Sequence, residues 1–292
     1  MEKYMSIKFT GISDEGADLL SGQLALHREL GWDSMEIRSV EGKNICEMPE
    51  EDFNRIYEVL NEENIQVVGF ASSIANWARP ITGDFSLDTQ DLLRAAPRMR
   101  RMHTPYLRIM SYTQGERNPE QWADESISRV KELSRMAEGE GIVLVHENCD
   151  GWASSEPERL ERLLESVQSP ALKVVFDMGN PLSHGHPEEK VWDFLKACGD
   201  RIAHVHIKDC YMNDAGEAVH CLPGEGQCHV QPIVRHLVAN QNYSGYVSIE
   251  PHMVFQFHEG MDDSADGDVR KAHNYLEYGK KTMELFSSRE FL

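Results

Sequence analysis

Short apolar runs rich in β-branched residues alternate along the chain with longer stretches of amphipathic pattern. Eight such runs predict strands, at residues 7–12, 34–37, 65–70, 106–110, 142–146, 173–176, 202–207 and 246–249. Between them, apolar residues recur at the spacing of a helix face. This spacing predicts helices over residues 16–30, 52–60, 89–102, 119–138, 156–167, 187–197, 230–240 and 269–286.

Alternation of strands and helices predicts parallel strands, because each helical crossover returns the chain to the same end of the sheet. The near-continuous apolar run at residues 65–70 fits a sheet covered on both faces. Eight repeats point to a (β/α)8 TIM barrel. The alternative, a doubly wound open sheet, calls for a glycine-rich phosphate loop after the first strand. Residues 11–16 (GISDEG) lack the GxGxxG pattern and contain two acids, so we favour the barrel.

Composition and charge narrow the classes of protein further. The 292 residues include no linker or low-complexity tract, so we predict a single barrel domain over residues 1–292. With a mean hydropathy of −0.50 and no apolar run near twenty residues, a membrane span is not expected. The net charge of −20 argues against a nucleic-acid partner, which usually needs a basic surface.

The six cysteines form no CxxC pair, which in a chain able to bury a large core predicts reduced thiols. No secretory signal is visible in the first residues. We therefore expect a cytoplasmic location. Barrels of this kind often associate through their helices, so homo-oligomerisation stays open.

In a TIM barrel, the chemistry lies at the carboxyl ends of the strands. The predicted strands five to eight each deliver one metal-capable side chain at that level, namely Glu147, Asp177, His206 and Glu250. A single acid at a strand end is often a helix cap or ion-pair partner, but four on consecutive strands indicate a shared metal site. Three carboxylates and an imidazole suit a divalent cation, with Mn²⁺ first and Mg²⁺, Co²⁺ or Zn²⁺ as alternatives.

These residues, with the sequences around them, also resemble a known family. The segments are FDMGN at 176–180, HIKD at 206–209, LPGEG at 222–226 and IEPH at 249–252, together with RPITGDF at 79–85 and YLRIMSY at 106–112. They resemble the sugar phosphate isomerase/epimerase superfamily, the xylose isomerase-like TIM barrels, over essentially the whole chain. That superfamily includes ketose 3-epimerases, inosose isomerases and inosose dehydratases.

The resemblance implies a metal-dependent isomerase or epimerase acting on a small keto-sugar or related polyol. Glu147, Asp177, His206 and Glu250 match the superfamily's metal ligands, and Glu147 and Glu250 match the acid/base pair of its epimerases. In this chemistry a divalent ion acidifies the proton next to a carbonyl and stabilises the enediolate. Returning that proton gives isomerisation or epimerisation, whereas expelling a β-hydroxyl gives dehydration. A dehydratase or lyase acting on an inosose or 3-oxo-glycoside is therefore the alternative.

Five further residues are candidate substrate contacts. Lys208 lies two residues after His206, hence on the same side of the strand, although an ion pair with Asp209 or Glu225 at the rim is an equal alternative. The other four candidates are Asn180, His252, Trp152 and Trp77. Asn180 and Met212 stand where ketose 3-epimerases have histidine and arginine, which weakens that specific reading. His204 and His146 are expected to be structural.

Two other functions are weaker. An abasic-site endonuclease of the same superfamily needs additional histidines, whereas the third and fourth strands are followed by Ala71-Ser72-Ser73 and Ser111-Tyr112. A non-catalytic sugar-binding barrel would not need the complete set of four ligands.

Overall fold

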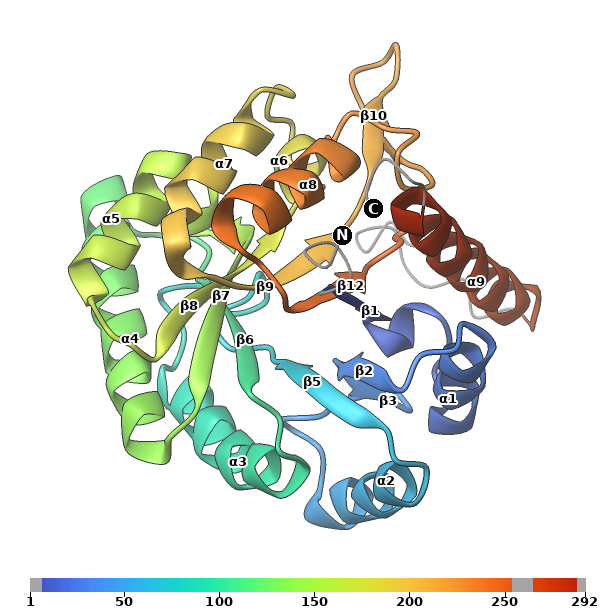
Figure 1. The fold of residues 1–292 in the computed structure, drawn as a ribbon. Helices are drawn as coiled ribbons and strands as arrows, with labels where there is room; N and C mark the ends of the chain where they lie inside the picture. The colour runs from blue at the N-terminus through green and yellow to red at the C-terminus, as the bar shows by residue number, and fades with distance from the viewer. Residues whose placement is uncertain (1–6, 254–264, 288–292) are drawn as a thin grey trace. The chain divides into compact units, whose positions relative to one another are not determined.

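The computed structural model describes residues 7–253 and 265–287, in which strands and helices alternate along the chain (Figure 1). The fold is a (β/α)8 barrel, as the alternation predicts. The eight strands of its sheet are β1 (Lys8–Gly11), β2 (Ser34–Ile37), β5 (Gln66–Ala71), β6 (Tyr106–Ser111), β7 (Val143–Gly151), β8 (Leu172–Asp177), β9 (Ile202–Ile207) and β12 (Tyr246–Ile249). All eight coincide with the predicted runs to within a few residues.

The helices also follow the predicted pattern. They are α1 (Leu20–Glu29), α2 (Glu50–Glu62), α3 (Ser86–Met102), α4 (Pro119–Glu140), α5 (Pro157–Val167), α6 (Asn180–Ser183), α7 (Lys190–Cys198), α8 (Val230–Gln241) and α9 (Ala265–Ser287). Asn118 caps α4, because its side chain accepts the N–H groups of Glu120 and Gln121. The short helix α6 was not predicted. The short strands β3 (Ser39–Val40), β4 (Lys43–Asn44) and β10 (Cys210–Met212), which pairs with β11 (Ala218–His220), were not predicted either.

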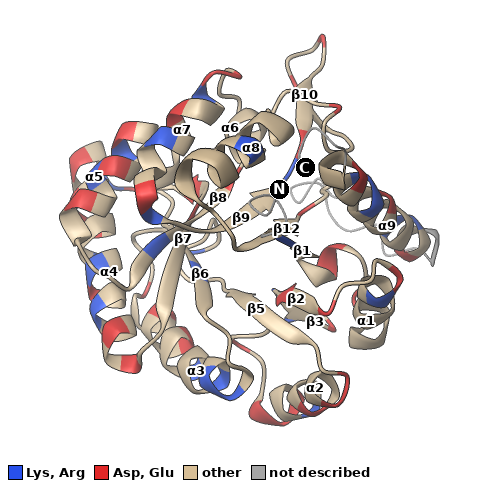
Figure 2. Cartoon of the chain, in the orientation of Figure 1, with Lys and Arg blue, Asp and Glu red and all other residues tan. Residues whose placement is uncertain are grey.

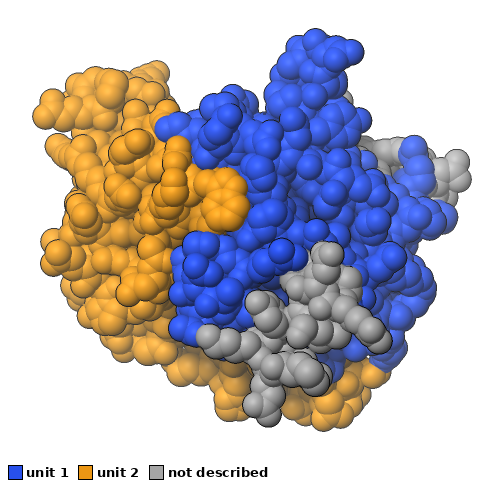
Figure 3. Space-filling view, turned by 45° about the horizontal axis from the view of Figure 1, so that its top comes forward, with its two compact units in different colours: residues 1–42, 177–191, 204–292 blue, residues 43–176, 192–203 orange. Residues whose placement is uncertain are grey.

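The described residues fall into two compact units, coloured separately in Figure 3. Unit 1 comprises the described parts of residues 1–42, 177–191 and 204–292, and unit 2 comprises residues 43–176 and 192–203. That the whole of residues 1–292 is a single domain stays a prediction. No helix within residues 7–253 and 265–287 has the length and apolarity that crossing a bilayer requires.

In unit 1, parallel pairing aligns side chains from three strands. Thr10 of β1 lies opposite Ser248 of β12, and Ser248 lies opposite His206 of β9. A parallel bridge from Ile12 to Glu36 adds β2 beside β1. Because strand side chains alternate between faces, these polar residues share one side of the sheet. The fully buried Val205, Ile207, Val247 and Ile249 pack on the other side.

Helix α9 packs closely against the first strand of unit 1. A Cβ atom on Gly11 would lie 2.1 Å from the Tyr275 hydroxyl, so only glycine fits there. The same hydroxyl lies 2.8 Å from Nε2 of buried His27, whose Nδ1 is 2.6 Å from the Ser34 carbonyl oxygen. Aromatic and polar contacts thus join α9, α1 and β2.

Unit 2 has its own parallel sheet core. β5 pairs with β6, β6 with β7, and β7 with β8. Apolar side chains such as Leu144 and Val174 are fully buried, whereas α3, α4 and α5 carry Lys, Arg, Asp and Glu residues of both signs (Figure 2). His146 is an exception among the buried apolar residues of β7. Neither of its ring nitrogens has a hydrogen-bond partner among the described residues, and burial lowers the pKa of His146 to about 4.

His146 should make stability depend on pH. Its folded-state pKa of about 4 lies below the usual 6.5, so between these values the unfolded chain binds more protons. Stability is therefore lost as pH falls through this window, by about 3 kcal/mol for this group. We expect His146→Leu to flatten this part of the pH profile in urea titrations. An equally steep profile in the variant would contradict the assignment, and replacing the exposed His103 with Asn is the control.

Candidate functional site

Three of the predicted metal ligands converge in unit 1. Asp177 ends β8, His206 is the penultimate residue of β9, and Glu250 directly follows β12. His206 Nδ1 lies 3.9 Å from Asp177 Oδ2 and 4.0 Å from Glu250 Oε2. All three side chains are buried. These separations exceed hydrogen-bond length, as expected for atoms that face a common centre.

Glu147, the fourth predicted ligand, belongs to unit 2. It lies within β7, buried, and its Oε2 atom is 3.1 Å from Nη1 of Arg108 on β6. Arg108 also donates to the Ser72 carbonyl oxygen. The place of Glu147 in the ligand set stays a prediction.

Asp177 is held by the backbone that follows it. Its Oδ1 atom accepts the N–H groups of Gly179 and Asn180 at 2.8 and 2.7 Å. This bonding fixes the carboxylate at the start of α6 and directs Oδ2 towards His206. Gly179 is required by close approach, since a Cβ atom there would lie 2.6 Å from the Cβ of Lys208.

Lys208 is buried among these acids. Its Nζ atom lies 2.7 Å from Glu250 Oε2 and 3.5 Å from Asp177 Oδ2, and it donates to Asn180 Oδ1 at 2.9 Å. The rim alternative does not hold, because Asp209 instead accepts backbone N–H groups of residues 210, 224, 226 and 228. The predicted substrate contacts Lys208 and Asn180 therefore touch each other beside the candidate ligands.

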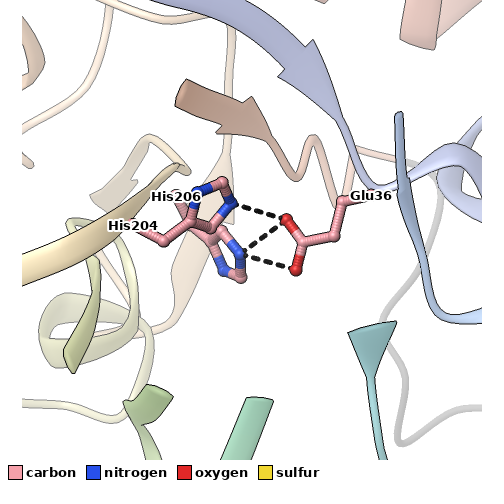
Figure 4. Close-up of side chains that lie close together, drawn as sticks. All are labelled: Glu36, His204 and His206. Carbon is pink, nitrogen blue, oxygen red and sulfur yellow. Dashed lines mark hydrogen bonds and ion pairs between the residues drawn. The ribbon is translucent and has the colours of Figure 1, made fainter. Parts of the chain in front are cut away.

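Glu36 was not identified from the sequence. It lies on β2, 2% exposed, and its carboxylate faces the imidazoles of His204 and His206 (Figure 4). Burial would raise the pKa of Glu36, but the two imidazoles outweigh it and hold that pKa well below its usual value. The available signal was a lone acid in the interior of a short apolar strand, Ser34-Met35-Glu36-Ile37.

Glu250 is held on its other side by Arg38, a second residue that sequence reasoning missed. Arg38 Nη1 lies 3.2 Å from Glu250 Oε1, Nη2 lies 2.6 Å from Glu15 Oε1, and Nε lies 3.0 Å from Asp14 Oδ2. All of these groups are largely buried, so Arg38 compensates three carboxylates in an interior where unpaired charge is costly.

His252, a predicted substrate contact, completes this cluster. Its Nε2 atom lies 3.4 Å from Glu15 Oε1 and 3.3 Å from Glu250 Oε1. Burial and Lys208 lower the pKa of His252, but Glu15 and Glu250 prevail and raise it to about 9. Its backbone is left-handed, with φ of 50°, which is uncommon for a residue other than glycine and places its ring against the acids.

The two tryptophans differ in exposure. Trp152 follows β7, is 2% exposed, and has the Arg162 guanidinium 5.5 Å from its ring centroid. Trp77 follows β5 and is 37% exposed. Of the two, Trp77 presents more of its ring to solvent, and the role of both in substrate binding stays a prediction.

The chemistry of the donor set fits a divalent cation. Two buried carboxylates and an imidazole present oxygen and nitrogen atoms within 4.8 Å of one another, and no thiolate is among them. Such a set suits Mn²⁺, Mg²⁺, Co²⁺ or Zn²⁺.

Comparison with known proteins assigns the chain to a family. The family model described as "Xylose isomerase-like TIM barrel" matches residues 24–276. The chain belongs to the xylose isomerase-like TIM barrel family. This confirms the resemblance seen in the sequence.

The proteins that are similar to this chain are named for several different activities. An inosose dehydratase of Mesomycoplasma hyopneumoniae is 23% identical over 296 residues, covering 92% of this chain and 90% of the relative. A crystal structure of IOLI protein with a binding zinc atom has a TM-score of 0.70 at 16% identity and covers 98% of this chain and 99% of its own. The 3-keto-D-glucoside 4-epimerase YcjR of E. coli has a TM-score of 0.66 at 16% identity, covering 97% and 99%.

Arg38 forms ion pairs with Asp14, Glu15 and Glu250, a group that we term the Arg38 cluster. Replacing Arg38 should reduce the free energy of unfolding by an amount that depends on pH. Arg38→Met should destabilise the protein by about 3 kcal/mol at neutral pH, because it leaves buried carboxylates uncompensated. Burial raises the pKa of Glu15, but His252 and Arg38 together lower it to about 2. Without Arg38 this folded-state pKa should rise, so that folded protein takes up a proton at Glu15 more readily as pH falls. The deficit should therefore be smaller at about pH 5 than at about pH 8. Urea unfolding at both values measures it.

The matched control is Arg100→Met, which breaks the more exposed Arg100–Glu140 pair. It should cost at most about 1 kcal/mol at either pH. A deficit for Arg38→Met that grows as pH falls would contradict the cluster's role.

Proposed function

We propose that this protein is a divalent-metal-dependent enzyme that removes the proton next to the carbonyl of a keto-sugar or keto-polyol. The observation that supports it most is the convergence of Asp177, His206 and Glu250, with Lys208 at 2.7 Å from Glu250. Membership of the xylose isomerase-like family supports the same chemistry.

Asp177, His206 and Glu250 would hold the ion, with Glu147 as the fourth ligand predicted from its strand end. A bound divalent ion would polarise the substrate carbonyl and so acidify the adjacent carbon-bound proton. Mn²⁺ stays our first expectation, and Zn²⁺ gains support from the zinc-binding IOLI structure.

Within this proposal Glu250 and Glu147 are the acid/base pair. Burial raises the pKa of Glu250, but Lys208 and His252 outweigh it and hold that pKa well below its ordinary value. The group is therefore ionised, which is the protonation state that a general base needs. Arg38 holds Oε1 of Glu250 and thereby orients Oε2. In this proposal Lys208 and Asn180 would donate hydrogen bonds to substrate oxygens beside it.

Return of the proton gives an isomer or epimer, which is our leading assignment. Dehydration is the second candidate, and two observations favour it. The inosose dehydratase relative matches over nearly its whole length. In addition, His252 has a pKa of about 9 beside Glu250, so it is an acid able to protonate a departing hydroxyl group.

Proton exchange tests the proposal. The Mn²⁺-loaded protein in D₂O, given ketoses, inososes and 3-oxo-glycosides, should incorporate deuterium next to one carbonyl, as followed by NMR. Glu250→Gln and Glu147→Gln should each slow exchange by at least about 100-fold, because each removes a proton-transfer group. The product then identifies the reaction, since dehydration alone removes one water by mass.

Glu225→Gln is the matched control, because Glu225 pairs with Lys281 at 3.6 Å and is not among the candidate ligands. It should exchange at the rate of the unmodified protein. Absence of exchange with every substrate, in protein shown to bind the metal, would contradict the proposed function.

A further inference from the structure

We propose that Glu36 is a positioning residue that selects which nitrogen of His206 faces the metal centre. The inference rests on the proposed metal-dependent function and extends it to a residue on a different strand, β2. Its basis is the hydrogen-bonded group formed by Glu36, His204 and His206, which we term the Glu36 network (Figure 4).

The contacts of His206 distinguish its two nitrogens. Nε2 lies 3.2 and 3.1 Å from the two carboxylate oxygens of Glu36. Nδ1 is the atom that lies near Asp177 and Glu250. An ionised carboxylate can only accept hydrogen bonds, so Nε2 must carry a proton. In neutral imidazole the lone pair then resides on Nδ1, the nitrogen that faces the candidate ligands.

The carboxylate of Glu36 is itself fixed. His204 Nε2 lies 2.8 Å from Glu36 Oε2 and 3.0 Å from Ser248 Oγ. The His204 ring stands perpendicular to the ring of His206, with their centroids 5.3 Å apart. Glu36 and His204 are each only 2% exposed. The network therefore connects β2, β9 and β12 and leaves Glu36 little freedom to turn away from His206.

A carboxylate that accepts from the outer nitrogen of a ligating histidine orients the ring and makes the ligating nitrogen more basic. Here this effect would act on Nδ1 of His206. The three members of the network could themselves be arranged around a second cation. Their 2.8–3.2 Å nitrogen–oxygen separations are those of direct hydrogen bonds, so we favour the positioning role. The number of metal ions bound per chain distinguishes the two alternatives.

Metal affinity tests the inference without any substrate. Co²⁺ binding, followed by its visible absorption and by competition with a chelator, should show one ion per chain. Glu36→Gln should weaken binding roughly 10-fold and Glu36→Leu up to roughly 100-fold, because the amide retains an acceptor and leucine has none. Both should also alter the Co²⁺ spectrum.

The matched control is Asp88→Asn in unit 2. Asp88 is 1% exposed and bonds Arg79 and Tyr112, so its replacement also disrupts a buried carboxylate. It should lower the melting temperature but leave cobalt affinity and spectrum unchanged. Unchanged affinity and spectrum in folded Glu36→Gln would overturn the inference, as would two cobalt ions per chain with one lost in that variant.

Nitrogen-15 NMR of the metal-free protein, on the alkaline side of neutrality, separates this inference from the proposed function. The inference expects His206 to carry its proton on Nε2 and to lose that preference in Glu36→Leu. A proton on Nδ1 alone would overturn it. Failure of the unmodified protein to bind any divalent metal would instead count against the proposed function.

Discussion

The structure of unit 1 depends on compensating negative charge in a buried interior. An ionised carboxylate removed from water costs several kcal/mol unless cations or hydrogen-bond donors replace the water. Here each acid has a specific partner. Arg38 pairs with the acids near the first strand, and Lys208 pairs with the carboxylates of the candidate ligands. The imidazoles of His204 and His206 pair with Glu36. The acids concerned are Asp14, Glu15, Glu36, Asp177 and Glu250.

This compensation also explains how one carboxylate can serve two purposes. Glu250 meets Arg38 through Oε1 and Lys208 through Oε2. Asp177 similarly accepts backbone N–H groups at Oδ1, and its Oδ2 atom lies towards Lys208 and His206. In each case one oxygen is used for support, so the direction of the other is fixed before any ligand arrives. Such preorganisation is what an ion-binding or proton-transferring group requires.

Periodicity was sufficient to predict the fold and the residues at the strand ends. The alternation of strand and helix placed Asp177, His206 and Glu250 at one level, and the period of two along a strand placed Lys208 beside them. Glu36 and Arg38 were missed because they lie within and just after β2. The prediction of metal ligands considered only the ends of strands five to eight. The partners of Glu36 and Arg38 lie 23 to 212 residues away along the chain and have no local signature.

Other features depended on tertiary packing that no local pattern specifies. Trp152 lies in a short 3-10 turn after β7 and is buried, whereas the sequence left its environment open. The hairpin of β10 and β11 has turn-forming residues at Asn213-Asp214-Ala215-Gly216. The flanking segments contain too few apolar residues in alternation to predict strands. His252 was predicted as a substrate contact. Neither its left-handed backbone nor its contact with Glu15, 237 residues away along the chain, could be predicted from the local sequence.

The arrangement of β2 has a consequence for how the sheet selects its register. Glu36 and Arg38 alternate with Met35 and Ile37, and both apolar side chains are fully buried. In most strands, a slip by one residue is opposed by apolar groups that become exposed. In β2 both faces are buried, so exposure alone discriminates weakly. A slip of β2 by one residue would instead separate Glu15 and Glu250 from Arg38, and the two imidazoles from Glu36. Electrostatic interactions therefore select the register of β2. The residues that form the candidate site also destabilise misfolded arrangements of this strand.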